Sequence, residues 1–260
     1  MAGRVRVEKE GALGWVVFDH PERRNAITAD MWAAIPEAMA DLARDPDVRV
    51  GILRGQGEAA FVSGADISEF QEQRSGEGAM AYEERNALAF DALAQFPKPL
   101  LAMVHGFCVG GGMAIVIQAD LRYAANDARF SLPAGRLGLG YPAGSLRTLV
   151  RLVGPAIAKD LFFTARRFGA QEAHRLGLVN EVLPKAALET RVRGVADEIA
   201  ANAPLSLRAA KRVIEDYGRE AAERDPGAVR AAIRDCFVSD DYQEGIRAFL
   251  EKRPPRFQGR

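Results

Sequence analysis

The pattern of apolar and polar positions predicts an α/β protein. Residues 5–8 alternate apolar and charged side chains, residues 15–18 are all apolar, and glycines lie between the two segments, which is typical of a β-hairpin. Residues 29–42 carry apolar side chains at helical spacing, and Thr28 is placed to cap that helix. Pro36 lies inside the same segment and is expected to kink it.

The rest of the chain divides into a mixed core and a helical C-terminal part. Strands are predicted at residues 48–53, 100–104, 121–124 and 178–182, and helices at residues 79–96, 155–164 and 170–176. Beyond Pro184 the pattern is helical, with breaks near Pro204 and Pro226. We therefore expect residues 1–184 to form an α/β core and residues 185–260 to form an appended helical region.

Two stretches have no clear periodicity. Residues 71–78 are polar and punctuated by glycine, which predicts a mobile segment of the kind that often covers a neighbouring site. Residues 130–145 contain two prolines and four glycines and are expected to be irregular.

A glycine triplet at residues 110–112 follows the apolar strand predicted at residues 100–104. Glycines at the start of a helix allow close approach of a ligand to the backbone, and the first N–H groups of the helix are free to bind an anion or an oxyanion. A second glycine turn, at residues 63–67, also joins a strand to a helical segment. From spacing alone, a glycine-rich packing turn explains the triplet equally well.

Composition narrows the function. The chain has 35 basic and 35 acidic residues, so its net charge gives no reason to expect binding to nucleic acid or to an anionic membrane surface. No apolar run reaches the roughly 18 residues of a membrane span, and the first ten residues do not resemble a signal peptide, so a cytoplasmic protein is expected. Cys108 and Cys236 have no disulfide framework or metal-ligand spacing, so no metal is expected. For Cys108 a buried packing role is favoured over a reactive thiol.

Six short motifs occur along the chain in a fixed order: PERRNAIT at 21–28, FVSGADI at 61–67, KPLLAMVHGFCVGGG at 98–112, ARFSLPAGRLGL at 128–139, GLVNEVLP at 177–184 and FLEKRPPRFQGR at 249–260. Together they resemble the crotonase superfamily, also called the enoyl-CoA hydratase/isomerase family. The resemblance implies a crotonase-like spiral of ββα units, a helical C-terminal trimerisation region, and homotrimers that commonly pair into hexamers. It also implies an acyl-CoA thioester as substrate, with coenzyme A as part of the substrate and no separate cofactor.

The resemblance also assigns residues to two tasks. The backbone N–H groups of Ala65 and Gly111 would bind the thioester oxygen as it becomes an enolate, and such fixed donors typically contribute roughly 3 to 4 kcal/mol each. The residues implied to contact coenzyme A are Arg24, Ala26, Ala65, Asp66 and Ile67, with Phe249 and Lys252 reaching it from a neighbouring subunit. Taken alone, Arg24 and Lys252 are equally typical of a solvated surface.

Three positions depart from the pattern of the family. Its hydratases carry two glutamates that hold and split water, and the matching residues here are Ala114 and Ala134. Alanine cannot transfer a proton, whereas a general acid or base typically contributes about 10²- to 10⁴-fold. The carboxylate used by some isomerases of the family matches Pro142 here. Ordinary hydration or isomerisation by these positions is therefore not expected.

Two alternatives accommodate the missing glutamates. Decarboxylation of a malonyl-type or methylmalonyl-type thioester forms the enolate by loss of carbon dioxide and needs no base, and a neutral pocket would suit such a substrate. Tyr141 lies in a Leu-Gly-x-x-Tyr setting similar to that of the family's methylmalonyl-CoA decarboxylases, although Ala65 stands where those enzymes carry histidine. The other alternative is an acyl-CoA-binding homologue without catalytic activity.

Other side chains near the predicted site could move a proton. His105 ends the central strand and is the one histidine expected close to the site, although a role in holding a loop is favoured for it. Glu83 and Glu84 could bring a carboxylate from the predicted helix at 79–96, but charge on a helix is usually a solvated face. Arg136 and Tyr141 are expected near the acyl group.

Overall fold

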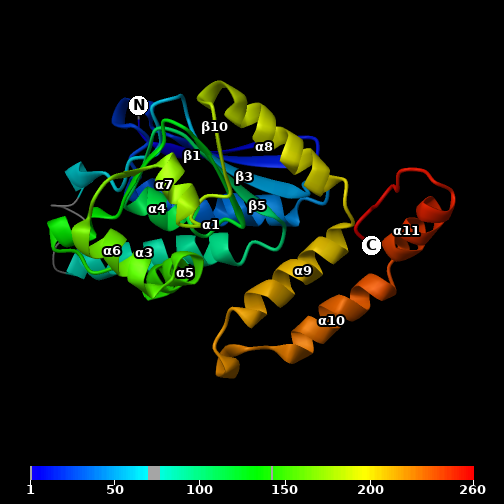
Figure 1. Ribbon diagram of the computed structural model, residues 1–260. Coiled ribbons are helices and arrows are strands. Elements are labelled where there is room, and N and C mark those ends of the chain that lie inside the picture. Colours follow the sequence, from blue (N-terminus) through cyan, green and yellow to red (C-terminus); the bar gives the residue numbers. More distant parts are fainter. Residues whose placement is uncertain (1, 70–76, 142) are drawn as a thin grey trace.

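Two β-sheets form the centre of the molecule (Figure 1). The computed structural model describes residues 2–69, 77–141 and 143–260. The larger sheet has the strand order β1 (Arg4–Glu10), β2 (Leu13–Asp19), β3 (Val50–Gly55), β5 (Leu100–Val104), β7 (Leu121–Ala125) and β10 (Glu181–Leu183). The smaller sheet has the strand order β4 (Ala60–Val62), β6 (Phe107–Val109), β8 (Arg129–Ser131) and β9 (Phe168–Gly169).

Helices surround the sheets and extend beyond them (Figure 1). They are α1 (Ala29–Arg44), α3 (Glu77–Ala94), α4 (Gly111–Val116), α5 (Ala143–Val153), α6 (Pro155–Thr164), α7 (Ala170–Arg175), α8 (Lys185–Ala200), α9 (Pro204–Tyr217), α10 (Pro226–Phe237) and α11 (Asp240–Leu250). Short 3₁₀ turns are η1 (Pro21–Arg23), η2 (Ile67–Glu69), η3 (Pro133–Leu137) and η4 (Ala221–Glu223). Within the described ranges, every helix is too short or too polar to span a bilayer.

The core repeats a strand, strand, helix unit three times. In each repeat the first strand joins the larger sheet and the second joins the smaller one: β3 and β4 precede α3, β5 and β6 precede α4, and β7 and β8 precede α5. Successive repeats pair in parallel, so β3, β5 and β7 lie side by side in one sheet and β4, β6 and β8 in the other. The expected spiral of ββα units is confirmed.

The N-terminal elements follow the sequence pattern closely. The hairpin forms, and the Thr28 hydroxyl accepts a hydrogen bond from the Met31 N–H at 3.2 Å, which caps α1 as predicted. Pro36 lies inside α1, which continues without a break to Arg44. The irregular segment expected at 130–145 instead contains the end of β8, the η3 turn and the start of α5. The segment expected to be mobile, 71–78, lies almost wholly outside the described residues.

Two apolar cores lie on opposite faces of the larger sheet. The larger core brings together side chains of both sheets and of α1, α3 and α4. It includes Phe18 and Phe61, whose ring centres lie 5.6 Å apart in an edge-to-face arrangement. The smaller core joins the other face of the sheet to α8 through residues such as Trp15 and Val192. α8 therefore covers the larger sheet, although it follows the predicted boundary at residue 184 (Figure 1).

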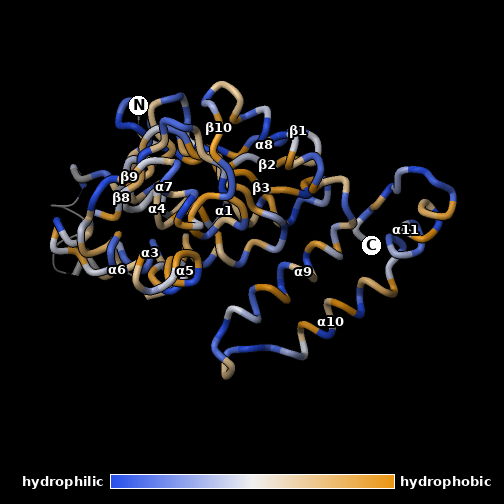
Figure 2. Tube along the Cα trace, viewed as in Figure 1, coloured by the Kyte–Doolittle hydropathy of each residue, from blue (hydrophilic) through white to orange (hydrophobic). Residues whose placement is uncertain are grey.

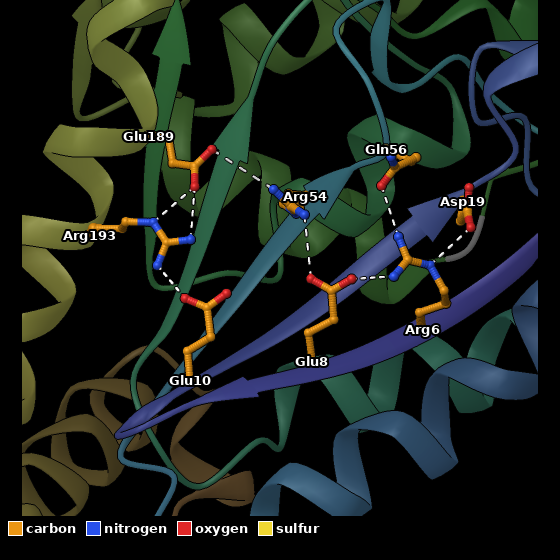
Figure 3. Close-up of polar contacts among 8 residues, drawn as sticks. All are labelled: Arg6, Glu8, Glu10, Asp19, Arg54, Gln56, Glu189 and Arg193. Carbon is orange, nitrogen blue, oxygen red and sulfur yellow. Dashed lines mark hydrogen bonds and ion pairs between the residues drawn. The ribbon is translucent and has the colours of Figure 1, made fainter.

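Charged side chains border the face of the larger sheet that α8 covers (Figure 3). Arg193, on α8, lies over the Trp15 ring at 4.6 Å and pairs with Glu10 of β1 and with Glu189. Arg54, on β3, lies 5.4 Å from the centre of the same ring. Ion pairs at such partly exposed positions are individually weak. Together they join β1, β3 and α8, and we assign the cluster a structural role.

The C-terminal helices extend away from the core. In Figure 1, α9 and α10 lie side by side, and α11 lies at the end of the molecule farthest from α3 and α6. Their exposed large apolar residues are Ile214, Tyr217, Ile233, Phe237, Val238, Tyr242, Ile246, Phe249 and Leu250, and Figure 2 shows orange segments along these helices. The assignment of residues 185–260 to oligomerisation stays a prediction.

Candidate active site

Two glycine turns lie side by side at the ends of β4 and β6. The two strands are parallel neighbours, with Val62 opposite Cys108, so their C-terminal ends meet at one edge of the smaller sheet. Gly64 has φ of 121° and Gly110 has φ of 53°, and both values favour glycine. A Cβ built on Gly110 would lie 4.0 Å from the Cα of Gly64. The fold thus brings together the two glycine turns that were predicted from the sequence.

The first turn is held by the loop that precedes α1. The Ile27 N–H donates to the Gly64 carbonyl at 2.8 Å, and the Asp66 N–H donates to the Ile27 carbonyl at 2.9 Å. Because successive peptide groups of an extended segment point in opposite directions, the Ala65 N–H points away from Ile27. A Cβ on Gly111 would lie 3.8 Å from the Ala65 nitrogen, so this nitrogen lies beside the second turn.

The second donor is the N–H of Gly111, the first residue of α4. The first N–H groups of a helix have no acceptor within it, so this donor is left for another partner. Within the described ranges, neither the Ala65 N–H nor the Gly111 N–H donates to another backbone group. Because α4 has only six residues, a helix dipole adds little at this point, and oxyanion binding by the two N–H groups stays a prediction.

The glycine triplet also allows α4 to lie very close to β4. A Cβ on Gly112 would lie 2.3 Å from the carbonyl oxygen of Val62, and one on Gly111 would lie 3.0 Å from the Trp32 ring. Glycine at these positions therefore serves packing, and its role in ligand access stays a prediction. The close packing fixes the position of the Gly111 donor relative to β4.

A cavity of about 200 Å³ opens beside the two donors. It is bounded by the two turns, by one face of α3 and by the loop from Pro133 to Tyr141. Most of its lining side chains are apolar, among them Trp32, Phe90 and Leu139. Since ligand cavities for larger molecules typically measure about 300 to 1,000 Å³, this one suits a short chemical group.

Ala114 and Ala134 line this cavity. Both are buried, at 2% and 6% exposure, and each presents only a methyl group. The two positions therefore adjoin the paired N–H groups, as the family pattern implies, but they contribute no group that can move a proton. Pro142, the third departure from that pattern, lies outside the described residues.

Tyr141 also lines the cavity, but its hydroxyl is engaged. The hydroxyl donates to the Gly110 carbonyl at 3.2 Å, and the ring packs edge to face against Phe162. Burial, and then the neighbouring Cys108 and Glu83, raise the pKa of Tyr141 above its ordinary value. The phenol therefore stays protonated and holds the glycine turn in place. Its role as an acid or orienting group stays a prediction.

One face of α3 supplies polar groups to the cavity, and the sequence pattern did not decide which residues these are. Tyr82, Glu83 and Asn86 all line the cavity, whereas Glu84 is exposed to solvent and does not. Asn86 was missed altogether. A signal for it exists in the sequence, because positions 82, 86 and 90 share one helical face and a lone amide among aromatic side chains stands out.

The residues implied to contact coenzyme A fall into two groups. Ala26 is buried, Arg24 lies over the Phe107 ring at 5.1 Å, and both flank the first glycine turn. Asp66 follows Ala65 and accepts two hydrogen bonds from Ser68. Burial would raise the pKa of Asp66, but these hydrogen bonds and the charge of Arg23 outweigh it and lower the pKa.

Ile67 begins the η2 turn directly after Asp66, so its backbone belongs to this first group. The second group consists of Phe249 and Lys252. Phe249 is 83% exposed on α11, and Lys252 follows that helix with φ of 53°. Because α11 lies far from α3 and α6 in Figure 1, contact of these two residues with the same ligand would need a second copy of the chain, as the sequence led us to expect.

Two further expectations, on His105 and Arg136, need correction. His105 does not line this cavity but lines a separate one, with Lys185 and Glu58, on another part of the surface. Its pKa is lowered, first by burial and then by the charge of Lys185. Arg136 is exposed and donates to the Thr164 carbonyl, so it does not reach the acyl cavity.

Cysteine and metal chemistry have little support in the described residues. Cys108 is fully buried on β6, and burial raises the pKa of its thiol, which favours the packing role. Across residues 2–69, 77–141 and 143–260, no group of three or more His, Cys, Asp or Glu side chains is arranged to hold a metal ion.

The protein is thus an α/β protein in which two backbone N–H groups, those of Ala65 and Gly111, adjoin a small apolar cavity. Residues 8–260 match the model of the enoyl-CoA hydratase/isomerase family, and the chain belongs to this family, the crotonase superfamily. It is 35% identical over 249 residues to the short-chain-enoyl-CoA hydratase of Clostridium acetobutylicum, covering 96% of this chain and 95% of that protein.

Two further relatives extend the comparison. The chain is 32% identical over 265 residues to the peroxisomal Delta(3,5)-Delta(2,4)-dienoyl-CoA isomerase of Arabidopsis thaliana, covering 97% of this chain and 95% of that protein. A crystal structure of an enoyl-CoA hydratase/isomerase family protein from Hyphomonas neptunium superposes with a TM-score of 0.94, at 41% identity and 98% coverage of each chain. The crotonase fold predicted from the motifs is thereby confirmed.

Proposed function

We propose that this protein is an enzyme that acts on an acyl-CoA thioester by stabilising its enolate. The observation that carries the proposal is the pairing of the Ala65 and Gly111 N–H groups at the mouth of a small apolar cavity. Donors that are fixed before the reaction need no reorganisation, so they stabilise developing negative charge by roughly 3 to 4 kcal/mol each. The family relatives that are named for acyl-CoA substrates support the same assignment.

We further propose that Glu83 moves the proton. It is the carboxylate that the described residues bring to the cavity wall, and its charge contributes to the raised pKa of Tyr141, whose hydroxyl lies at the second turn. Ala114 and Ala134 contribute no base to the cavity. A carboxylate on α3 would therefore replace the groups that those two positions lack.

A single carboxylate suits migration of a double bond better than hydration, which needs both a base and an acid. The Glu83 carboxylate would remove a proton from C2 of a 3-enoyl thioester, and the electron pair of that C–H bond would form a dienolate bound by the two N–H groups. The same carboxylic acid would then return the proton to C4. The product is the 2-enoyl thioester, and Glu83 is restored as a carboxylate.

The decarboxylase hypothesis has less support. It requires a neutral pocket for the carboxylate of the substrate, whereas Glu83 lies in the cavity wall and would repel that charge. Tyr141, its proposed acid, directs its proton to the Gly110 carbonyl. A homologue that binds acyl-CoA without catalysis stays an alternative, and the experiment below separates it from an enzyme.

The test is isomerisation of 3-hexenoyl-CoA, followed by the absorbance of the conjugated product, together with exchange of the C2 protons in D₂O by NMR. We expect Glu83→Gln to lower both rates by about 10² or more, the usual contribution of a general base. Glu84→Gln is the matched control, because it is exposed on the same helix, and it should leave both rates unchanged. Equal rates for the two variants would exclude Glu83, and binding without exchange in the wild type would favour the non-catalytic alternative.

Assembly belongs to the same proposal. We propose a homotrimer, or a hexamer of two trimers, in which Phe249 and Lys252 of one copy reach the coenzyme A bound by another. The exposed apolar residues of α9, α10 and α11 are consistent with burial between copies. Sedimentation velocity of the full chain measures the state directly, and a monomer at micromolar concentration would contradict it. The cytoplasmic location stays a prediction.

A further inference from the structure

Asn86 is a buried polar side chain in the wall of an otherwise mostly apolar cavity, and its Oδ1 has no hydrogen-bond partner among the described residues. It is 5% exposed and lines the cavity from α3. Buried polar atoms are nearly always paired, because leaving one unpaired forfeits its hydrogen bonds to water. A polar group of a ligand that enters the cavity could form the hydrogen bond that Asn86 lacks.

The neighbouring buried polar groups do have partners. The Trp32 Nε1 donates to the Tyr82 hydroxyl at 3.0 Å on the same side of the cavity. Asn25, a buried amide under the first glycine turn, donates to the Gln56 and Ala60 carbonyls and accepts from the backbone of residue 20. Asn86 therefore differs from another buried asparagine of the same fold, and its position in the ligand cavity explains the difference.

Glu83 and Asn86 line the same cavity from different levels of α3. Asn86 follows Glu83 by three residues, which places it about 4.5 Å along the axis of the helix. If Glu83 acts at the carbons that react, Asn86 meets a different part of the acyl chain. An ionised carboxylate accepts hydrogen bonds and repels anions, so the same wall favours a neutral group that can donate.

We propose that the site selects acyl chains that carry a hydroxyl group away from the reacting carbons, and that Asn86 binds this hydroxyl. A hydroxyl both donates and accepts, so it complements the carboxamide of Asn86 in either orientation of its oxygen and nitrogen. A plain hydrocarbon chain would leave the amide unpaired, and a carboxylated chain would place a second negative charge near Glu83. This inference rests on the proposed function of the cavity as an acyl-CoA site.

The test compares affinities within a matched set of thioesters by isothermal titration calorimetry. The probes are hexanoyl-CoA, its 4-hydroxy, 5-hydroxy and 6-hydroxy derivatives, and adipoyl-CoA as the carboxylated analogue. We expect the wild type to bind at least one hydroxylated ester about tenfold or more tightly than hexanoyl-CoA, because a site built for a hydroxyl rejects the analogue without it. Adipoyl-CoA should bind most weakly.

Asn86→Leu keeps a similar shape but cannot form hydrogen bonds. It should abolish the preference for the hydroxylated ester while hexanoyl-CoA binds as tightly as before or more tightly, and Glu84→Gln should retain the wild-type preference. If Asn86→Leu does not fold, the same affinities are measured with Asn86→Met, and the affinities of the wild type for the set of thioesters still test the preference. Equal affinity of the wild type for all neutral esters, as expected if a water satisfies Asn86, would overturn the inference, as would a preference that survives in Asn86→Leu.

The outcomes also separate this inference from the proposed function. A hydroxyl preference without exchange of the C2 protons would support the role of Asn86 and overturn the catalytic proposal. Exchange of the C2 protons without a hydroxyl preference would support the catalytic proposal and overturn the role of Asn86. Failure of every thioester to bind would overturn both.

Discussion

Replacement of Gly112 by alanine tests whether the close packing of α4 on β4 fixes the second donor. The added Cβ would lie 2.3 Å from the Val62 carbonyl oxygen and 2.9 Å from the Val62 Cβ, whereas ordinary contact begins at 3.4 Å. The obstacle is backbone, so no side-chain rotation relieves it. α4 and β4 must therefore move apart by about 1 Å, since overlap at that distance is strongly repulsive.

The expected effects follow from that displacement. Overpacking of a core typically costs about 1 to 3 kcal/mol, and for a chain of this size each kcal/mol lowers Tm by roughly 2 to 4 °C. We therefore expect Tm to fall by about 2 to 12 °C. The Gly111 N–H moves with α4, and a displacement of 1 Å at a reacting group costs about 10²-fold in rate.

The assay combines thermal unfolding with exchange of the C2 protons of 3-hexenoyl-CoA. Gly144→Ala is the matched control, because Gly144 also lies in a helix and a Cβ there meets nothing within 4 Å. The control should keep its rate and its Tm, or gain stability from the better helix former. Wild-type Tm and rate in Gly112→Ala would refute the packing argument, and a lowered Tm with an unchanged rate would refute its link to the donor.

Two further predictions concern side chains beside the two cavities. Tyr141→Phe removes the hydrogen bond to the Gly110 carbonyl, worth about 1 kcal/mol, so kcat/KM for proton exchange should fall only a fewfold; a loss of about 10² or more would instead make Tyr141 a proton donor. Because the pKa of His105 is lowered in the folded chain, the unfolded chain binds more protons and stability should decline as pH falls below about 6.5, by at most about 1.4 kcal/mol per pH unit. His105→Gln should flatten that decline in denaturant unfolding between pH 7.5 and 5.5, and an unchanged slope would contradict the assignment.

Periodicity and turn chemistry predicted the long elements of the fold well. Thr28 caps α1 as expected, and α6 spans the predicted residues, because local signals such as a capping hydroxyl or a proline at a helix start act over one turn. Strands β6 and β8 were missed. Each has three residues, and a strand that short shows no alternation and is stabilised by its neighbours in the smaller sheet.

The site was predictable where it is built from backbone. The glycines of the two turns are visible in the sequence, and the family motifs assign the donors at Ala65 and Gly111 to them. The position of Glu83 was not predictable, because helical spacing alone does not tell which of two adjacent glutamates faces inward. His105 was placed wrongly, since the residue that follows β5 and the residue that ends β6, Val109, line different cavities.

The two N–H groups that we propose as donors belong to the main chain, and this has an evolutionary consequence. Among the twenty residues only proline lacks a backbone N–H, so almost any side-chain replacement nearby leaves the donor pair chemically intact. Side chains at positions 114 and 134 can therefore be lost, gained or exchanged by single mutations while the fold still presents the same two N–H groups. A lineage built on this scaffold can move its acid–base group from one wall of the cavity to another without passing through a form that has lost its hold on the substrate.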